Sequence, residues 1–178
     1  MIRLFAAIAI PSEIGAGLVS RQDGLPDARW RPMEAFHITL RFFGDVAENV
    51  AADLDAELAM VTGAPLNLEL EGVGAFGEGH EIHAVWAGVV EDPDLRQLAR
   101  RCETAARRAR LKPDTRVYKP HVTLAYLRRP NPDEVAAWLA GNNLLKSPPF
   151  RATSFGLYSS WRTAEGSRYR LEREYPLV

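Results

Sequence analysis

Apolar and polar residues alternate in several short stretches of the chain, and this period of two is typical of half-buried β-strands. In Phe36–Gly44, the residues His37, Thr39 and Arg41 fall on one face, and the residues between them are apolar. Leu66–Glu71 also alternates, and it predicts a hairpin with the return strand Glu81–Val90 around the glycine-rich segment Gly72–Gly79. The other predicted strands are Ile2–Ile10, Tyr118–Leu127, Ala152–Ser160 and Arg168–Leu177.

Spacings of three and four between apolar residues predict helices between these strands. The strongest pattern begins near Pro93 and continues to Ala109. Further helices are predicted after Pro11, over Val46–Leu58, and from Asn131-Pro132 to Leu139. No linker or low-complexity segment divides the chain, so we expect residues 1–178 to form a single domain. Strands and helices alternate in small groups, which favours an α+β fold or an α/β fold with mixed sheets.

One tetrapeptide occurs twice in the chain, each time on a predicted strand. His37-Ile38-Thr39-Leu40 recurs as His121-Val122-Thr123-Leu124, 84 residues later, and that spacing is close to half the chain. In each copy the histidine and threonine share a face of the strand. We therefore expect two related halves that face each other across a cleft, with one motif in each lobe (residues 37–40 and 121–124).

Two histidines on opposite sides of one phosphorus atom suit phosphoester chemistry. The attacking water must lose a proton and the leaving oxygen must gain one, and an imidazole can do either near neutral pH. Each such acid or base typically accelerates a reaction by ~10²–10⁴-fold. The hydroxyls of Thr39 and Thr123 could donate hydrogen bonds to the non-bridging phosphoryl oxygens. This scheme predicts no metal ion and no cofactor.

Paired H-x-T-Φ motifs, where Φ is apolar, are the signature of the 2H phosphoesterase superfamily. The chain resembles its RNA 2′,3′-cyclic phosphodiesterases, also called 2′-5′ RNA ligases, along nearly its whole length, including the blocks WRPMEAFHITLRFFGDV and VYKPHVTLAYL. The resemblance implies two antiparallel sheets that face a central cleft, with helices outside and a pseudo-two-fold repeat. It also implies metal-independent opening of 2′,3′-cyclic phosphate ends of RNA to 2′-phosphomonoesters. His37 would be the proton donor, His121 the proton acceptor, and Thr39 and Thr123 the phosphate-binding residues.

The second motif departs from the pattern of many relatives, which carry an arginine two residues after the leucine. Tyr126 stands there in this chain, with Arg128 and Arg129 slightly later. Arg41, expected on the same face as His37, is therefore the candidate for a cation that contacts the substrate. Tyr158 and Phe5 are candidates for stacking on a base.

Composition limits the classes of protein that the chain can belong to. The 22 Lys and Arg nearly balance the 23 Asp and Glu, which argues against a protein that coats nucleic acid through bulk positive charge. A single cysteine, Cys102, excludes an intrachain disulfide and a cysteine-based zinc site. No apolar run is long enough for a membrane span, and Leu4–Pro11 is better read as a buried strand than as a signal peptide. We expect a cytoplasmic monomer.

Several alternatives remain open from the sequence. A zinc site built from His37, His121 and a carboxylate is conceivable, but no ligand spacing supports it. His80 and His83 are expected to have surface or structural roles. The same chemistry could act on small cyclic nucleotides or an ADP-ribose cyclic phosphate, or run in reverse as 2′-5′ RNA ligation. A non-catalytic module that binds RNA ends is the alternative of a different class.

Overall fold

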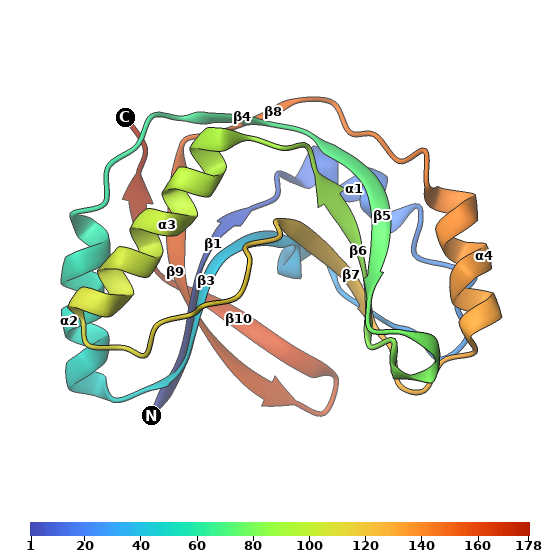
Figure 1. The fold of residues 1–178 in the computed structure, drawn as a ribbon, viewed down its shortest axis with the longest axis horizontal. Helices are drawn as coiled ribbons and strands as arrows, with labels where there is room; N and C mark the ends of the chain where they lie inside the picture. Colours follow the sequence, from blue (N-terminus) through green and yellow to red (C-terminus); the bar gives the residue numbers. More distant parts are fainter.

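The computed structural model describes residues 1–178 and contains two four-stranded sheets and one two-stranded sheet (Figure 1). The first sheet has the strand order β10-β9-β1-β3 and the second has the order β2-β7-β6-β5. Every pairing is antiparallel. The strands are β1 Ile2–Ala9, β2 Arg29–Trp30, β3 His37–Val46, β4 Leu66–Leu68, β5 Leu70–Phe76, β6 Ala84–Val89, β7 His121–Tyr126, β8 Phe150–Ala152, β9 Ser154–Thr163 and β10 Gly166–Pro176.

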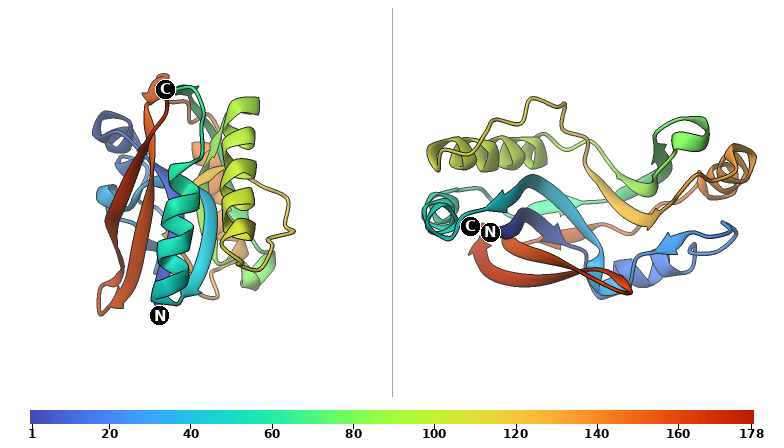
Figure 2. Two further views of the ribbon diagram at one scale, coloured as in Figure 1. Left: turned by 90° about the vertical axis from the view of Figure 1, so that its left-hand side faces the viewer. Right: turned by 90° about the horizontal axis from the view of Figure 1, so that it is seen from below.

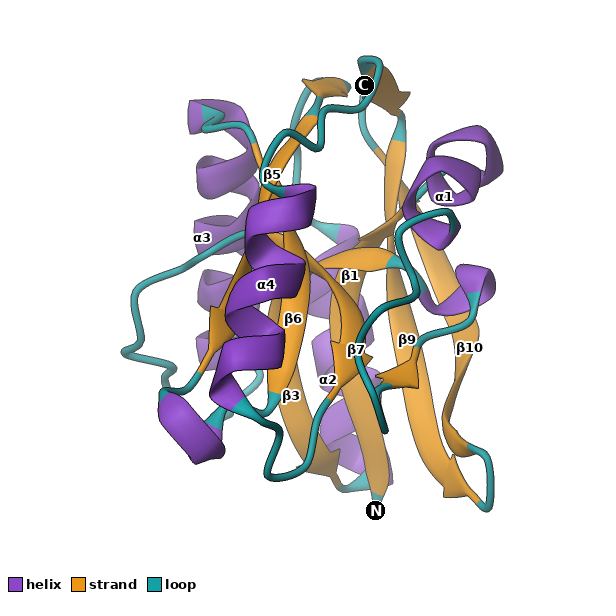
Figure 3. Ribbon diagram, turned by 90° about the vertical axis from the view of Figure 1, so that its right-hand side faces the viewer, coloured by secondary structure: helices purple, strands orange, loops and turns teal.

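Four α-helices cover the sheets, as the hydrophobic spacing predicts. They are α1 Ser12–Val19, α2 Glu48–Ala59, α3 Pro93–Arg108 and α4 Pro132–Asn142, and none is long and apolar enough to cross a membrane. Helix α3 packs against α2 and β3, whereas α4 packs against β5 (Figures 1 and 3). The pairs of helices α2–α3 and α1–α4 lie at opposite ends of the molecule, with the sheets between them (Figure 2). The α+β fold with antiparallel sheets and outer helices is confirmed.

Helix α3 shows why the sequence folds as it does. Its apolar stripe, which includes Leu95, Leu98 and Cys102, is almost fully buried. The Asp92 carboxylate accepts a hydrogen bond from the Leu95 N–H at 2.8 Å and caps the first turn. Pro93, at the first helical position, has no N–H to leave unpaired.

The glycine-rich segment is mostly strand rather than turn, contrary to the sequence prediction. Gly72 and Gly74 lie within β5, and the connection to β6 begins at Gly77. A Cβ on Gly74 would lie 2.3 Å from the Trp86 ring, so only glycine allows this close contact. Leu66–Leu68 does not belong to that hairpin, because it pairs with Phe150–Ala152. The two-residue strand β2 was not predicted.

The two motif strands carry matching β-bulges. In β3, Ala6 pairs with Arg41 and Ala7 pairs with Thr39, so Leu40 has no partner. In β7, Leu124 is skipped in the same way, between the pairs Val85–Ala125 and Trp86–Thr123. The burial pattern of the six residues from each motif histidine is identical in the two strands. The internal repeat therefore extends from the sequence to the details of backbone geometry.

Candidate active site

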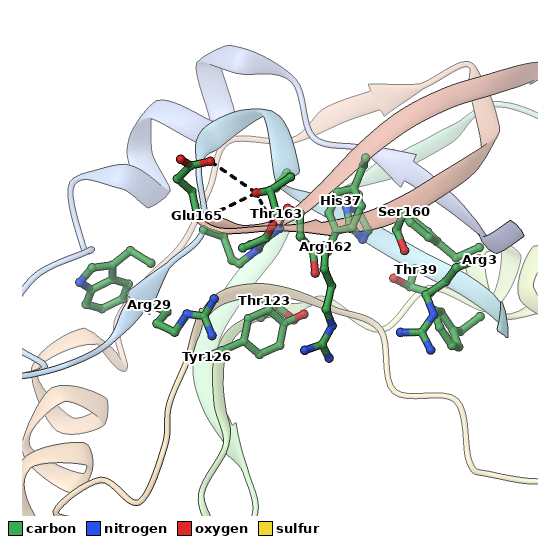
Figure 4. A pocket seen from close by; sticks show the side chains of 18 of the residues that line it. Arg3, Arg29, His37, Thr39, Thr123, Tyr126, Ser160, Arg162, Thr163 and Glu165 are labelled. Carbon is green, nitrogen blue, oxygen red and sulfur yellow. Dashed lines mark hydrogen bonds between the residues drawn. The ribbon is translucent and has the colours of Figure 1, made fainter. Parts of the chain in front are cut away.

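A cavity of about 540 Å³ lies between the two main sheets, and both motifs line it. Strand β3 contributes His37 and Thr39, and strand β7 contributes His121 and Thr123. The two strands also contact each other directly. Figure 4 shows the side chains of the cavity, with Thr39 and Thr123 approaching it from different strands. The structure thus brings together two His–Thr pairs that lie 84 residues apart in the sequence.

His121 is held by the backbone that precedes it. Its Nδ1 lies 2.7 Å from the Lys119 carbonyl oxygen. Because a carbonyl only accepts hydrogen bonds, Nδ1 must carry the proton, and Nε2 of the neutral ring is free to accept one. Phe76 meets the ring edge-on at a centroid distance of 4.8 Å. Burial lowers the pKa of His121 below its usual value, which keeps the ring neutral at neutral pH and leaves Nε2 able to accept a proton.

His37 lies in an aromatic cluster. Phe5 stacks on its ring at 4.8 Å, and Tyr169 contacts it edge-on at 5.1 Å. Burial lowers the pKa of His37 to about 4, a backbone hydrogen bond at Ala35 opposes this shift, and the positive charge of Arg31 adds to it. His37 is therefore neutral at pH 7 when the cavity holds no anion.

Arg41 does not lie on the cavity face of β3, so the prediction that it shares the face of His37 is wrong. The bulge at Leu40 turns Arg41 into the interior, where it pairs with Glu103 and donates to the Lys112 carbonyl at 2.7 Å. The residue is 9% exposed. Each of its three nitrogens donates a hydrogen bond within the protein, and Arg41 thereby links β3 to α3 and to the segment that follows α3.

The bulges place an aromatic residue on the cavity wall in each half. Phe42 and Tyr126 both line the cavity, although strict alternation would have turned them away from the histidines. They occupy equivalent positions after the two motifs, and both are exposed. The sequence alone gives no signal for this change of face.

Phe5 and Tyr158 form a stack behind His37. Tyr158 stacks on Phe5 at 5.3 Å with the rings 12° apart, and Phe5 in turn stacks on His37. Phe5 lines the cavity but is only 3% exposed, and Tyr158 does not line it. This geometry suits support of the imidazole better than stacking on a base.

Four arginines line the cavity, and the sequence singled out none of them. They are Arg3, Arg29, Arg31 and Arg162. Arg31 is 7% exposed, and its guanidinium lies over the rings of Tyr126 and Tyr169 at 5.6 and 5.3 Å. It is brought there by β2, which pairs with β7 beside the second motif.

The other two histidines do not line the cavity that holds both motifs, although His83 lines a second cavity with Thr39 and His121. His80 is exposed and its Nδ1 lies 3.2 Å from the Pro130 carbonyl. His83 stacks on Phe76 at 6.2 Å. No three side chains of His, Cys, Asp or Glu gather as a potential metal-binding group, so the zinc alternative finds no ligand set.

Comparisons with known proteins agree with this geometry. The model of the 2′-5′ RNA ligase superfamily matches residues 20–163. An RNA 2′,3′-cyclic phosphodiesterase of Archaeoglobus fulgidus is 29% identical over 95% of this chain and 97% of its own. A protein of the same name from Thermus thermophilus is 31% identical over 74% of this chain and 71% of its own.

Solved structures show the same fold. The Escherichia coli protein LigT, in a complex with 3′-AMP, superposes with a TM-score of 0.80 at 26% identity and covers 99% of this chain and 98% of its own. A phosphoesterase structure superposes with a TM-score of 0.83 at 23% identity, over 99% of this chain and 98% of its own. With its two H-x-T motifs in one cavity, the chain belongs to the 2′-5′ RNA ligase superfamily of 2H phosphoesterases.

Proposed function

We propose that the chain is a metal-independent phosphodiesterase that opens 2′,3′-cyclic phosphate ends of RNA and leaves a 2′-phosphomonoester. The observation that carries this proposal is the meeting of two H-x-T motifs, from two different sheets, in one cavity. The names of the relatives, which are RNA 2′,3′-cyclic phosphodiesterases, support the choice of substrate. Residues 1–178 would act as one two-lobed domain, with one motif in each lobe.

In the proposed reaction, His121 acts as the base. Its Nε2 takes a proton from water, and the water oxygen forms a new bond to phosphorus. The bond between phosphorus and the ribose 3′ oxygen breaks, and His37 gives its proton to that leaving oxygen. Thr39 and Thr123 hold the non-bridging oxygens, on which negative charge is concentrated. One water is consumed, and the product keeps its phosphate on the 2′ oxygen.

The lowered pKa of His37 makes its role as an acid dependent on the substrate. A ring with a pKa of about 4 holds almost no proton at pH 7. A cyclic phosphate carries one negative charge, and an anion close to an imidazole favours its protonated form. Substrate binding would thus raise the pKa of His37 and load the proton that the leaving oxygen needs.

An RNA oligonucleotide that ends in a 2′,3′-cyclic phosphate tests this function directly. We expect hydrolysis in the presence of a metal chelator and a product with a 2′-phosphate. His37→Ala and His121→Ala should each lower kcat by about 10²–10⁴-fold, while circular dichroism shows an unchanged fold. Full activity in both variants, or a 3′-phosphate product, would contradict the assignment.

Small cyclic nucleotides are the second candidate substrates. A cavity of about 540 Å³ falls in the size range of small-molecule sites, roughly 300–1,000 Å³. The related LigT, whose structure contains 3′-AMP, shows that a relative with this fold binds a single nucleotide. Comparison of kcat/KM for a nucleoside 2′,3′-cyclic phosphate and for the oligonucleotide decides between the two substrates.

A further inference from the structure

Strand β2 and the residue that follows it carry two arginines on the same side. Arg29 and Arg31 are two residues apart on extended backbone, so their side chains share a face. Arg29 pairs with Tyr126 of β7, and the Arg31 N–H donates to the Leu124 carbonyl at 2.8 Å. The backbone of both arginines is thereby fixed beside the second motif.

The two guanidinium groups converge at the turn between β9 and β10. A Cβ built on Gly166 would lie 3.5 Å from Nη1 of Arg31 and 3.6 Å from Nη2 of Arg29. Both groups therefore approach one point on the cavity wall. Two like charges that approach one point repel each other.

No carboxylate of the protein neutralises this pair. Neither Arg29 nor Arg31 takes part in any of the protein's ion pairs, which all involve other arginines. Glu165 is the one acidic residue in the cavity lining; its side chain is 76% exposed and lies 3.7 Å from Arg168. A guanidinium as buried as that of Arg31 normally has a counterion. The missing partner points to an anionic ligand.

Arg31 is also held in place before any ligand arrives. Its Nη2 donates to the Ser167 carbonyl at 3.0 Å, and its guanidinium lies over the Tyr126 and Tyr169 rings. A guanidinium has five N–H donors, so most of them remain for a ligand. A planar group with fixed orientation and free donors suits the oxygens of a phosphate, which it can bind through two hydrogen bonds.

We propose that Arg29 and Arg31 form a second phosphate subsite, which binds the phosphate on the 5′ oxygen of the terminal nucleotide while its 2′,3′-cyclic phosphate lies between the motifs. This inference rests on the proposed function and extends it. Arg29 pairs with Tyr126, three residues from Thr123, and three residues of strand span about 10 Å. The arginine pair therefore lies beside the reacting phosphate, at a separate position in the same cavity.

Three substrates distinguish the sources of that phosphate. The first is adenosine 2′,3′-cyclic phosphate, which has no 5′-phosphate; the second carries a 5′-phosphomonoester; the third is a dinucleotide with an internal phosphodiester and the same cyclic end. We expect kcat/KM to be about 10- to 100-fold higher for the second and third, as one or two charge-assisted hydrogen bonds provide. An advantage for the third alone would identify the internal phosphodiester as the ligand.

Variants assign the effect to the two arginines. Arg29→Gln and Arg31→Gln should each remove most of the advantage of the phosphorylated substrates, mainly through KM. Arg151→Gln is the matched control, because Arg151 is an exposed strand arginine with no ion-pair partner and lies outside the cavity. Arg29 is itself exposed, so its replacement keeps the test valid if the Arg31 variant does not fold.

The outcomes separate this inference from the proposed function. Hydrolysis of all three substrates with equal kcat/KM would overturn the second subsite and leave the cyclic phosphodiesterase intact. An unchanged preference for the phosphorylated substrates in Arg29→Gln and Arg31→Gln would also overturn it. No hydrolysis of any of the three would instead contradict the proposed function.

Discussion

At the scale of single residues, the two histidines that the sequence indicates are side chains whose pKa values the fold lowers. Paired H-x-T motifs are visible in the chain, because strand alternation alone places each histidine beside its threonine. What the sequence cannot show is the environment of each ring. Burial, Arg31 and the Lys119 carbonyl set the pKa and the tautomer, and they come from distant segments or from backbone conformation.

The pH dependence of catalysis should follow these shifts. The pKa of His37 lies at about 4 and that of His121 below its usual 6.5, so both limbs of the kcat/KM profile should fall on the acidic side of 6.5. A bound phosphate anion should raise both pKa values, so we expect the kcat profile to be displaced to higher pH. Steady-state kinetics between pH 3.5 and pH 9 measure both profiles, and kcat/KM limbs above 7 would contradict the shifts.

The stability of the protein should also depend on His37. Its folded pKa, about 4, lies below the unfolded value of 6.5, so the unfolded chain binds more protons between these pH values. The contribution is fully present above pH 6.5 and is lost as pH falls toward 4; it amounts to at most ~3 kcal/mol. Urea unfolding of His37→Gln at pH 7 and pH 4.5 checks this, because the variant should lose less stability than the parent over that interval.

At the scale of elements, helices could be predicted better than strand pairing. The apolar stripe and cap of α3 are local features, and the sequence indicates the helix almost to its last residue. The bulges at Leu40 and Leu124 depend on the register with β1 and β6, which no local pattern records. For this reason strand alternation predicts the wrong face for Arg41. Strand β2 is only two residues long, and its existence depends on β7.

The cap of α3 offers a test of one element. Asp92→Ala removes the acceptor of the Leu95 N–H and should lower the free energy of unfolding by about 1 kcal/mol. Asp92 does not line the cavity, so kcat/KM should stay the same. Chemical denaturation and steady-state kinetics on one preparation give both values. Asp94→Ala, on the next exposed acidic residue, serves as the control that keeps the cap.

At the scale of the whole molecule, near-neutrality conceals a strongly uneven distribution of charge. The net charge is −1, yet four arginines and one glutamate line the cavity. An average over the chain therefore says little about a site that holds one RNA end. A cavity assembled from both sheets also explains why no arginine of the lining could be recognised in the sequence.

Salt should weaken substrate binding, and the steepness of this dependence should grow with the number of phosphates that the protein binds. For a single strand, the logarithm of affinity falls by about 0.7 per phosphate for each tenfold rise in salt. Two phosphates, one between the motifs and one at Arg29 and Arg31, predict a slope of about −1.4 for the dinucleotide substrate. KM measured from 20 to 500 mM potassium chloride gives the slope. A slope near zero would contradict electrostatic binding of the substrate phosphates.

The matching bulges have a consequence for how such an enzyme can be re-engineered. Each bulge separates a buried position, Arg41 or Ala125, from its neighbour in the cavity, Phe42 or Tyr126. Residues at 42 and 126 can therefore be randomised in a library without repacking the hydrophobic interior. Because the two positions belong to equivalent strands, a library at both would explore the two walls of the cavity independently.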